Sequence, residues 1–304
     1  MGLSTSAEWI GTVPSPLRTI VQQGKPLVRS FVWSLLRGTP VVVGPGGVLP
    51  RLLEGLLFGV GRGLAVSGSG QLFVAADVLG WRAAWGAVEV GGLPALWLGS
   101  AIGLGVLLRQ HWADLGRELQ AHRDWRSLLP LVAALPCLVL QLGLHPTTDG
   151  LLGGVAVGTS LLLTGRAHRS FAPDQKTDQA GKTVSLTTAL VAGLLASLGA
   201  FMGLSAVSVL IAVAVSARVD PERAGRFALM TITPVALIEG IAGWGATASL
   251  GAVPLIIGAA LGAAAGGWLL LRVLLVRWRS MLPWLGSYVT ALGAVLLLFG
   301  VFAP

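Results

Sequence analysis

The chain has 304 residues, of which 54% are hydrophobic and only 11% are charged, and its mean hydropathy is +0.79. Soluble domains carry about 25% charged residues, and a soluble fold could not cover this much apolar surface with polar side chains. The composition therefore excludes a soluble globular protein and predicts an all-α polytopic membrane protein.

The net charge of +8 does not indicate a nucleic-acid partner, because the basic residues fall in short breaks between apolar segments. The single cysteine, Cys137, excludes an intrachain disulfide and suggests no metal cluster, so we expect neither a metal nor a cofactor.

Residues 1–50 differ in composition from the rest and are interpreted as an N-terminal extension. Basic residues from Arg18 to Arg37 alternate with apolar ones, a pattern typical of an amphipathic helix on an anionic membrane surface. A transmembrane helix over residues 27–49 is the alternative, although the Pro- and Gly-rich sequence VVVGPGGVLP argues against it. The remaining residues, 51–304, are expected to form one transmembrane domain.

Apolar segments follow one another regularly after residue 50, separated by short basic or small-residue breaks. Helix parity places every group of basic residues on one side of the membrane, whereas the loops at 145–150 and 243–252 contain no Lys or Arg. The positive-inside rule makes the basic side cytoplasmic. We expect the arginine-rich stretch 109–126 and all four histidines to lie in solvated loops. The expected helices or half-helices are 52–66, 69–80, 93–108, 128–143, 150–165, 184–200, 203–217, 227–243, 252–271 and 285–302.

An internal repeat is visible at an offset of 138 residues, with one copy at about 51–166 and the other at about 183–304. Each copy begins with a short apolar segment that breaks at a turn of small residues. Short, glycine-interrupted segments at matching positions in two halves indicate a binding site near the middle of the membrane. The pattern predicts an inverted repeat with two re-entrant (broken) helix pairs. The matches join Gly55-Leu56-Leu57, Gly61 and Ser67 to Gly193-Leu194-Leu195, Gly199 and Ser205.

Six sequence blocks also have a characteristic order and spacing. They are RGLAVSGSGQL at 62–72, LWLGSAIGLGV at 96–106, PLVAALPCLVLQLGL at 130–144, GVAVGTSLLLTGR at 154–166, ALVAGLLASLGAFMGLSAVSVL at 189–210 and PERAGRFALMTITP at 221–234. Together they resemble the undecaprenyl-pyrophosphate phosphatase family (UppP/BacA), over about residues 50–303. These are multi-pass enzymes of the bacterial cytoplasmic (inner) membrane that recycle the polyprenyl carrier of cell-wall synthesis. The resemblance implies the same fold of two re-entrant helix pairs and a polyprenyl lipid as the partner.

The resemblance also implies a phosphatase site built from two glutamates four residues apart, a serine, a histidine and an arginine. At the matching positions this chain has Phe58, Arg62, Gly68, Gln71 and Ala206. A phenylalanine cannot ligate a metal, an arginine repels one, and a glutamine cannot act as a general acid or base. Alanine lacks the guanidinium fork that stabilises a transferred phosphoryl group. We therefore expect a catalytically degenerate member of the family, with no catalytic residue.

Several polar side chains remain near the two breaks as candidates for a binding site. Arg62 lies between apolar segments, where a charge is costly unless it is paired or faces a polar ligand. It binds a lipid phosphate, or it forms a structural ion pair with Glu54 or Asp77. Serines in membrane helices also bond to their own backbone, which is the alternative for the hydroxyl groups. The candidates for lipid or phosphate binding are Arg62, Ser67, Ser69, Gln71, Ser205 and Ser208, and those for buried charges are Glu54, Asp77 and Glu239.

Three functions follow as hypotheses. The first is a protein that binds, and translocates, a polyprenyl-phosphate or similar anionic lipid. The second is a structural or accessory subunit with protein partners in a larger membrane complex. The third is a divergent undecaprenyl-diphosphatase with a relocated site that uses Glu54 and Asp77.

Overall fold

The fold comes from a computed structural model that describes residues 48–79, 82–121, 125–144, 154–170, 183–201, 204–244, 252–276 and 278–302. Within these ranges the chain forms helices and no β-strand. The expected N-terminal amphipathic helix lies outside the described residues. The helices are α2 (Val48–Gly63), α3 (Gly68–Leu79), α4 (Arg82–Leu107), α5 (Arg109–Gln120), η2 (Trp125–Leu128), α6 (Leu129–Leu144), α7 (Gly154–Ser170), α8 (Leu186–Phe201), α9 (Ala206–Ser216), α10 (Pro221–Trp244), α11 (Ala252–Val276) and α12 (Trp278–Phe302).

Among the described residues, two helices are long and apolar enough to cross a membrane. They are α10, with 24 residues, and the Ala252–Val273 part of α11, with 22 residues. The pair Gly92–Leu107 and Arg109–Gln120, bent by 74°, makes a third if it is counted as one span. These helices agree with the predicted all-α membrane fold.

Close helix packing holds α2 and α4 against α11. Gly55, Gly59 and Gly63 recur every four residues on α2, and a Cβ at any of them would collide with backbone atoms of α11. The close approach is mutual, because a Cβ on Gly258 or Gly262 of α11 would collide with carbonyl oxygens of α2. Small residues at this spacing let helix backbones approach closely in a membrane, where apolar burial gives no net driving force between helices.

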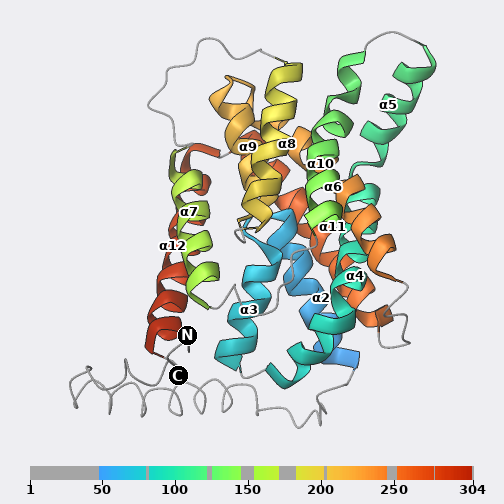
Figure 1. Ribbon diagram of the computed structural model, residues 1–304. Helices are drawn as coiled ribbons and strands as arrows, with labels where there is room; N and C mark the ends of the chain where they lie inside the picture. Colours follow the sequence, from blue (N-terminus) through green and yellow to red (C-terminus); the bar gives the residue numbers. More distant parts are fainter. Residues whose placement is uncertain are drawn as a thin grey trace, which may run out of the picture.

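The two broken helix pairs occupy the centre of the molecule and point toward each other (Figure 1). In this view α2 and α3 rise from the lower end, and α8 and α9 descend from the upper end, so that the two breaks lie at mid-height. The α7 and α12 helices lie side by side at the left of the same view and pack mainly on each other. The predicted repeat boundaries and the inverted symmetry stay predictions.

The first break is a Schellman motif, in which the backbone folds back on the end of α2. The amide of Val66 bonds to the carbonyl of Gly61 at 2.8 Å, and the amide of Ala65 to that of Arg62 at 3.3 Å. Ala65 takes the left-handed conformation, φ 63°, that glycine usually supplies at this position. Ser67 then caps α3, because its Oγ accepts a hydrogen bond from the amide of Gly70 at 3.3 Å.

The second break uses the same kind of cap. Ser205 has an extended backbone, and its Oγ accepts a hydrogen bond from the amide of Ser208 at 3.4 Å. The two serines matched by the sequence repeat thus have the same role, since each begins the second helix of its pair.

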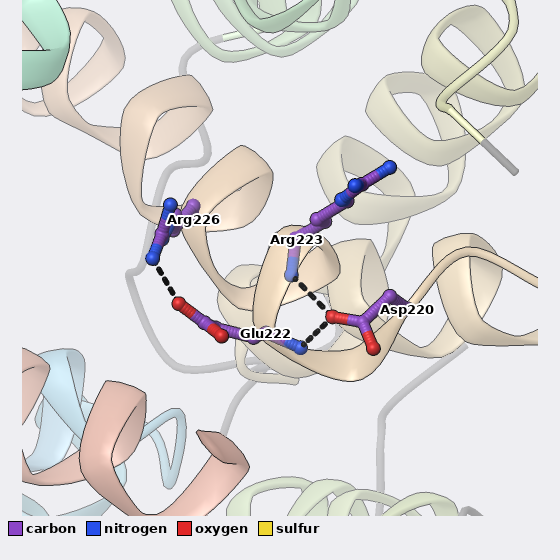
Figure 2. Close-up of polar contacts among 4 residues, drawn as sticks. All are labelled: Asp220, Glu222, Arg223 and Arg226. Atoms are coloured by element: carbon purple, nitrogen blue, oxygen red, sulfur yellow. Dashed lines mark hydrogen bonds and ion pairs between the residues drawn. The ribbon is translucent and has the colours of Figure 1, made fainter. Parts of the chain in front are cut away.

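The cap of α10 is built from an acidic residue. The carboxylate of Asp220 accepts hydrogen bonds from the amides of Glu222, at 3.0 Å, and Arg223, at 3.2 Å (Figure 2). One turn further on, the side chains of Glu222 and Arg226 form an ion pair. Pro221 suits the first helical turn, where its missing N–H is not needed.

The expectation of a solvated loop over 109–126 is wrong, because α5 and η2 occupy most of it. Leu108, Trp112 and Leu115 are spaced three and four residues apart and pack on the main hydrophobic core, which stabilises a helix with one apolar face.

The expectation that all four histidines lie in solvated loops is also wrong for two of them. His111 belongs to α5, and His168 is buried near the end of α7, with Nδ1 2.9 Å from the carbonyl oxygen of Thr164. The other two, His122 and His145, lie outside the described residues.

Candidate functional site

The two breaks are joined directly by a hydrogen bond. The hydroxyl of Ser208, in the first turn of α9, donates to the carbonyl oxygen of Ala65, in the turn between α2 and α3. Both groups are buried. The bond satisfies a carbonyl that a helix break would otherwise leave without a partner in the membrane interior.

The first turn is also packed too tightly for a larger residue at its centre. A Cβ on Gly68 would collide with the carbonyl oxygen of Phe58, and a Cβ on Gly61 would lie 2.9 Å from the Cα of Gly68. Gly68 is the position at which the resemblance implies a serine. The described conformation of the turn has no room for that side chain.

Arg62 lies in the last turn of α2, directly before the break. Its guanidinium carbon is 4.8 Å from the centre of the Trp97 ring and 5.9 Å from that of Phe58, which are cation–π distances. The Nε atom is buried and has no hydrogen-bond partner. The aromatic rings stabilise the charge in part and leave donor capacity unused.

The acidic group that acts on Arg62 is Glu239, from α10. The guanidinium and the carboxylate attract each other electrostatically, but no ion pair or hydrogen bond joins these two described residues. Both carboxylate oxygens of Glu239 are buried without a hydrogen-bond partner. A buried polar group without a partner is costly, so the site holds unused hydrogen-bonding capacity on both side chains.

Cys137 of α6 and Ser197 of α8 complete this part of the site. The Cys137 Sγ donates to the carbonyl oxygen of Gly193 at 3.3 Å, and the Ser197 hydroxyl bonds to the same oxygen at 2.8 Å. Cys137 also interacts electrostatically with Arg62 and Glu239. Helices α2 and α4 therefore bring Arg62 and Trp97 into contact, and Cys137 of α6 and Glu239 of α10 interact with Arg62 electrostatically.

Glu54 lies on α2 two turns before Arg62, and Phe58 lies between them on the same face. Glu54 is 3% exposed, and its Oε2 has no hydrogen-bond partner. Its charged neighbour is Arg51 rather than Arg62. Asp77 lies on α3, and its side chain is not among those described.

The polar residues predicted at the two turns bond mainly to the backbone or to one another. Ser67 and Ser205 cap helices, and Ser208 joins the two turns. Gln71 donates weakly to the carbonyl of Val66, at 3.5 Å, and accepts a hydrogen bond from the hydroxyl of Tyr288 at 2.9 Å. Ser69 is exposed. A ligand-binding role for these residues stays a prediction, and their described contacts stabilise the turns.

Sequence reasoning missed two members of the site. Trp97 and Cys137 lie inside apolar segments without a polar flank, and nothing in such a segment distinguishes a site-facing ring or thiol from a lipid-facing one. Sequence reasoning did select Glu239, because an acidic residue in an apolar helix is costly. Within the described part of the chain, no three His, Cys, Asp or Glu side chains come together in a way that could hold a metal ion.

Comparison with known proteins agrees with this architecture. The family model described as "Bacitracin resistance protein BacA" matches residues 51–295. No curated protein sequence matches the chain. The match covers α2 to most of α12, including both breaks and the helices α2, α4, α6, α8 and α10 that contribute to the site. The chain is therefore a membrane protein of the BacA (bacitracin resistance, undecaprenyl-pyrophosphate phosphatase) family.

Proposed function

We propose that the chain binds the phosphate-bearing headgroup of a polyprenyl-phosphate, or of a similar anionic lipid, beside Arg62. We further propose that it does not hydrolyse that lipid by the family mechanism. The observation that carries the proposal is Arg62 itself, an arginine at a helix break with a buried, unpartnered Nε and two aromatic rings around its guanidinium.

A phosphate supplies what this arginine lacks. Arginine binds phosphate through paired N–H donors in a planar fork, and the apolar rings exclude water, which strengthens the interaction. The lipid tail can stay in the membrane while the headgroup reaches the guanidinium. Family membership supports a polyprenyl lipid as the ligand class.

The same residues argue against the family reaction. Phe58 and Arg62 stand where the resemblance implies a pair of carboxylates, and Gly68 has no room for a serine. Gln71 has no group that titrates near neutral pH. Losing several members of a catalytic group together removes most of its rate enhancement.

Binding of farnesyl phosphate, a short isoprenyl monophosphate, to the purified full chain in lipid nanodiscs tests the proposal. Arg62→Ala is expected to weaken binding by about thirtyfold or more, because removing one partner of a buried charged contact costs about 2–5 kcal/mol. Arg272→Ala is the matched control, since Arg272 also lies over a tryptophan, Trp268 at 5.4 Å, but on the exposed face of α11. Equal affinities for the wild type and Arg62→Ala would overturn the proposal.

Translocation is the second part of the proposal. The α2–α3 and α8–α9 pairs enter from opposite ends of the molecule (Figure 1). Ser208 of α9 bonds to Ala65, three residues after Arg62, and this arrangement supports access from both sides. A lipid flip assay in proteoliposomes tests it, with wild-type transport expected above that of empty liposomes. Transport no faster than in empty liposomes would leave a binding protein only. A stoichiometric protein partner on purification, without lipid binding, would favour the accessory subunit instead.

A further inference from the structure

Two exposed aromatic side chains lie on α12 and form a stacked pair. Trp284 and Tyr288 are four residues apart, so they share one face of the helix. Their rings are inclined by only 12°, with centroids 6.4 Å apart, a geometry in which aromatic rings attract each other. The two side chains are 65% and 42% exposed. They therefore present a flat aromatic surface to the lipid, called here the aromatic stack.

The inner edge of the aromatic stack reaches the first break. The hydroxyl of Tyr288 donates to Oε1 of Gln71, a buried residue of α3, at 2.9 Å. A Cβ on Gly61 would lie 3.0 Å from the Cγ of Gln71, and Gly61 directly precedes Arg62. The aromatic stack is thus continuous, through Gln71, with the last turn of α2, to which Arg62 belongs.

Apolar packing holds α12 in this position. Val289, the residue after Tyr288, is buried in one hydrophobic cluster with Val66 of the first turn and Leu161 of α7. A hydrogen bond and an apolar contact from adjacent residues therefore fix α12 against the first break. The aromatic stack keeps its place relative to Arg62 as a result.

The direction of the tyrosine hydroxyl distinguishes the aromatic stack from a membrane-interface anchor. Interfacial Trp and Tyr residues turn their polar atoms toward water and lipid headgroups. The hydroxyl of Tyr288 bonds instead to Gln71, in the first turn of α3, which begins at the break at mid-height in Figure 1. The phenol thus joins the inside of the break to the lipid-facing surface.

Such a surface can discriminate between lipid tails by their stiffness. A tail gains little by leaving the bilayer for apolar side chains, because both surroundings are equally apolar. An isoprenoid tail has a double bond and a methyl branch in each repeat, so it has fewer free torsions than a saturated chain and loses less entropy on a rigid surface. Its flat double bonds can also make close dispersion contacts with aromatic rings.

We propose that the aromatic stack of Trp284 and Tyr288 binds the first isoprene units of the lipid tail while the phosphate lies beside Arg62. The stack thereby selects a polyprenyl phosphate over a saturated alkyl phosphate. The inference rests on the proposed function, which it deepens by assigning tail specificity to two residues of α12.

A pair of lipids with one headgroup tests the inference. Binding of farnesyl phosphate to the full chain in nanodiscs is compared with that of dodecyl phosphate, whose saturated, unbranched chain has the same main-chain length. We expect the wild type to prefer farnesyl phosphate. Trp284→Leu is expected to reduce the ratio of the two affinities by about twofold to about tenfold, which is the size of a ring contact. Differences in how the lipids partition into the bilayer cancel when this ratio is compared between proteins.

Two variants serve as matched controls. Trp268→Leu removes another exposed tryptophan, which is 51% exposed on α11, and should leave the affinity ratio unchanged. Tyr288→Phe keeps the ring and removes the bond to Gln71, and it should also keep the ratio, since the ring makes the proposed tail contact.

Fluorine NMR gives a second readout that needs no change at Trp284. Tyr288 is the one tyrosine of the chain, so protein labelled with fluorotyrosine gives a single resonance from this ring. Farnesyl phosphate should shift the resonance saturably, and dodecyl phosphate should shift it less. In labelled Arg62→Ala, the shift should require a higher concentration of farnesyl phosphate. This measurement decides the question if Trp284→Leu does not fold.

The outcomes separate the two proposals. Equal affinities of the wild type for the two lipids, or a preference that Trp284→Leu leaves unchanged, would overturn the role of the aromatic stack and leave the proposed function standing. A change of oligomeric state in Trp284→Leu would also overturn it, because the surface would then be an interface between copies of the chain. No binding of either lipid by the wild type would overturn the proposed function, and the tail specificity with it.

Discussion

The hydroxyl of Ser208 donates a hydrogen bond to the carbonyl oxygen of Ala65 and so joins the two broken helix pairs at their breaks. The two residues are 143 positions apart in the chain. Each break contributes one half of a contact that neither helix pair could make alone. The site beside Arg62 therefore depends on both halves of the protein.

Removing this bond should destabilise the fold. In Ser208→Ala the Ala65 carbonyl stays buried without a partner, which costs about 1–3 kcal/mol. Ser216→Ala, at the exposed end of the same helix, should change stability by less than about 0.5 kcal/mol. Thermal unfolding of both variants in detergent compares them directly. Equal unfolding temperatures for the two variants would show that the contact contributes little.

Gly68→Ser, which restores the residue that the resemblance implies, should also destabilise the chain. The new side chain would collide with the carbonyl oxygen of Phe58, and overpacking typically costs about 1–3 kcal/mol. Gly105→Ala is the control, because nothing lies within 4 Å of a Cβ at that position, and helix propensity makes the change neutral or stabilising. A Gly68→Ser variant as stable as the wild type would mean that the turn accepts a serine.

The interface between α2 and α11 should be as sensitive. Gly59→Ala would drive a methyl group into the backbone of α11 at Ala259, so the helices must separate and lose close packing. We expect a loss of about 1–3 kcal/mol in chemical unfolding, again measured against Gly105→Ala. The prediction fails if both alanine variants unfold at the same denaturant concentration.

At the N-terminus of α10, Asp220→Ala should cost about 1 kcal/mol, because two backbone amides lose their acceptor (Figure 2). Asp220→Ser should recover most of the loss, since serine is also a good N-cap. Asp114→Ala provides the comparison, because its ion pair with Arg117 is exposed and such pairs contribute little. If Asp220→Ser is no more stable than Asp220→Ala, capping is not the role of this residue.

The sequence predicted the breaks better than it predicted the site. The runs of glycine and serine near residues 65–71 and 201–208 cannot continue an apolar helix, and they do lie at the two breaks. The Schellman motif was not predictable in detail, because Ala65 seldom takes the left-handed conformation. The amphipathic helix α5 was missed because its charged residues obscured the apolar spacing of Leu108, Trp112 and Leu115.

The partners of Arg62 could not be predicted from local sequence. Glu54 lies on the same helix face and was an expected partner, yet the charge that acts on Arg62 comes from Glu239, 177 residues further along the chain. Trp97 comes from a third helix. Only the packing of α2, α4 and α10 brings these side chains together, and neither periodicity nor composition carries that information.

The phosphatase question has its own direct test. The purified chain should release no inorganic phosphate from undecaprenyl pyrophosphate above the buffer rate, with or without added divalent metal, because the carboxylate, serine and histidine positions are replaced. Release that depends on Glu54 or Asp77 would instead support a relocated catalytic site.

Native mass spectrometry of the chain purified from a bacterial membrane tests the central claim most directly. The wild type and Arg272→Ala should each carry a phosphate-bearing polyprenyl lipid, whereas Arg62→Ala, equally folded, should have lost most of it. A wild-type protein that carries no phosphorylated lipid, or an Arg62→Ala variant that carries as much as the wild type, would contradict the assignment of this site.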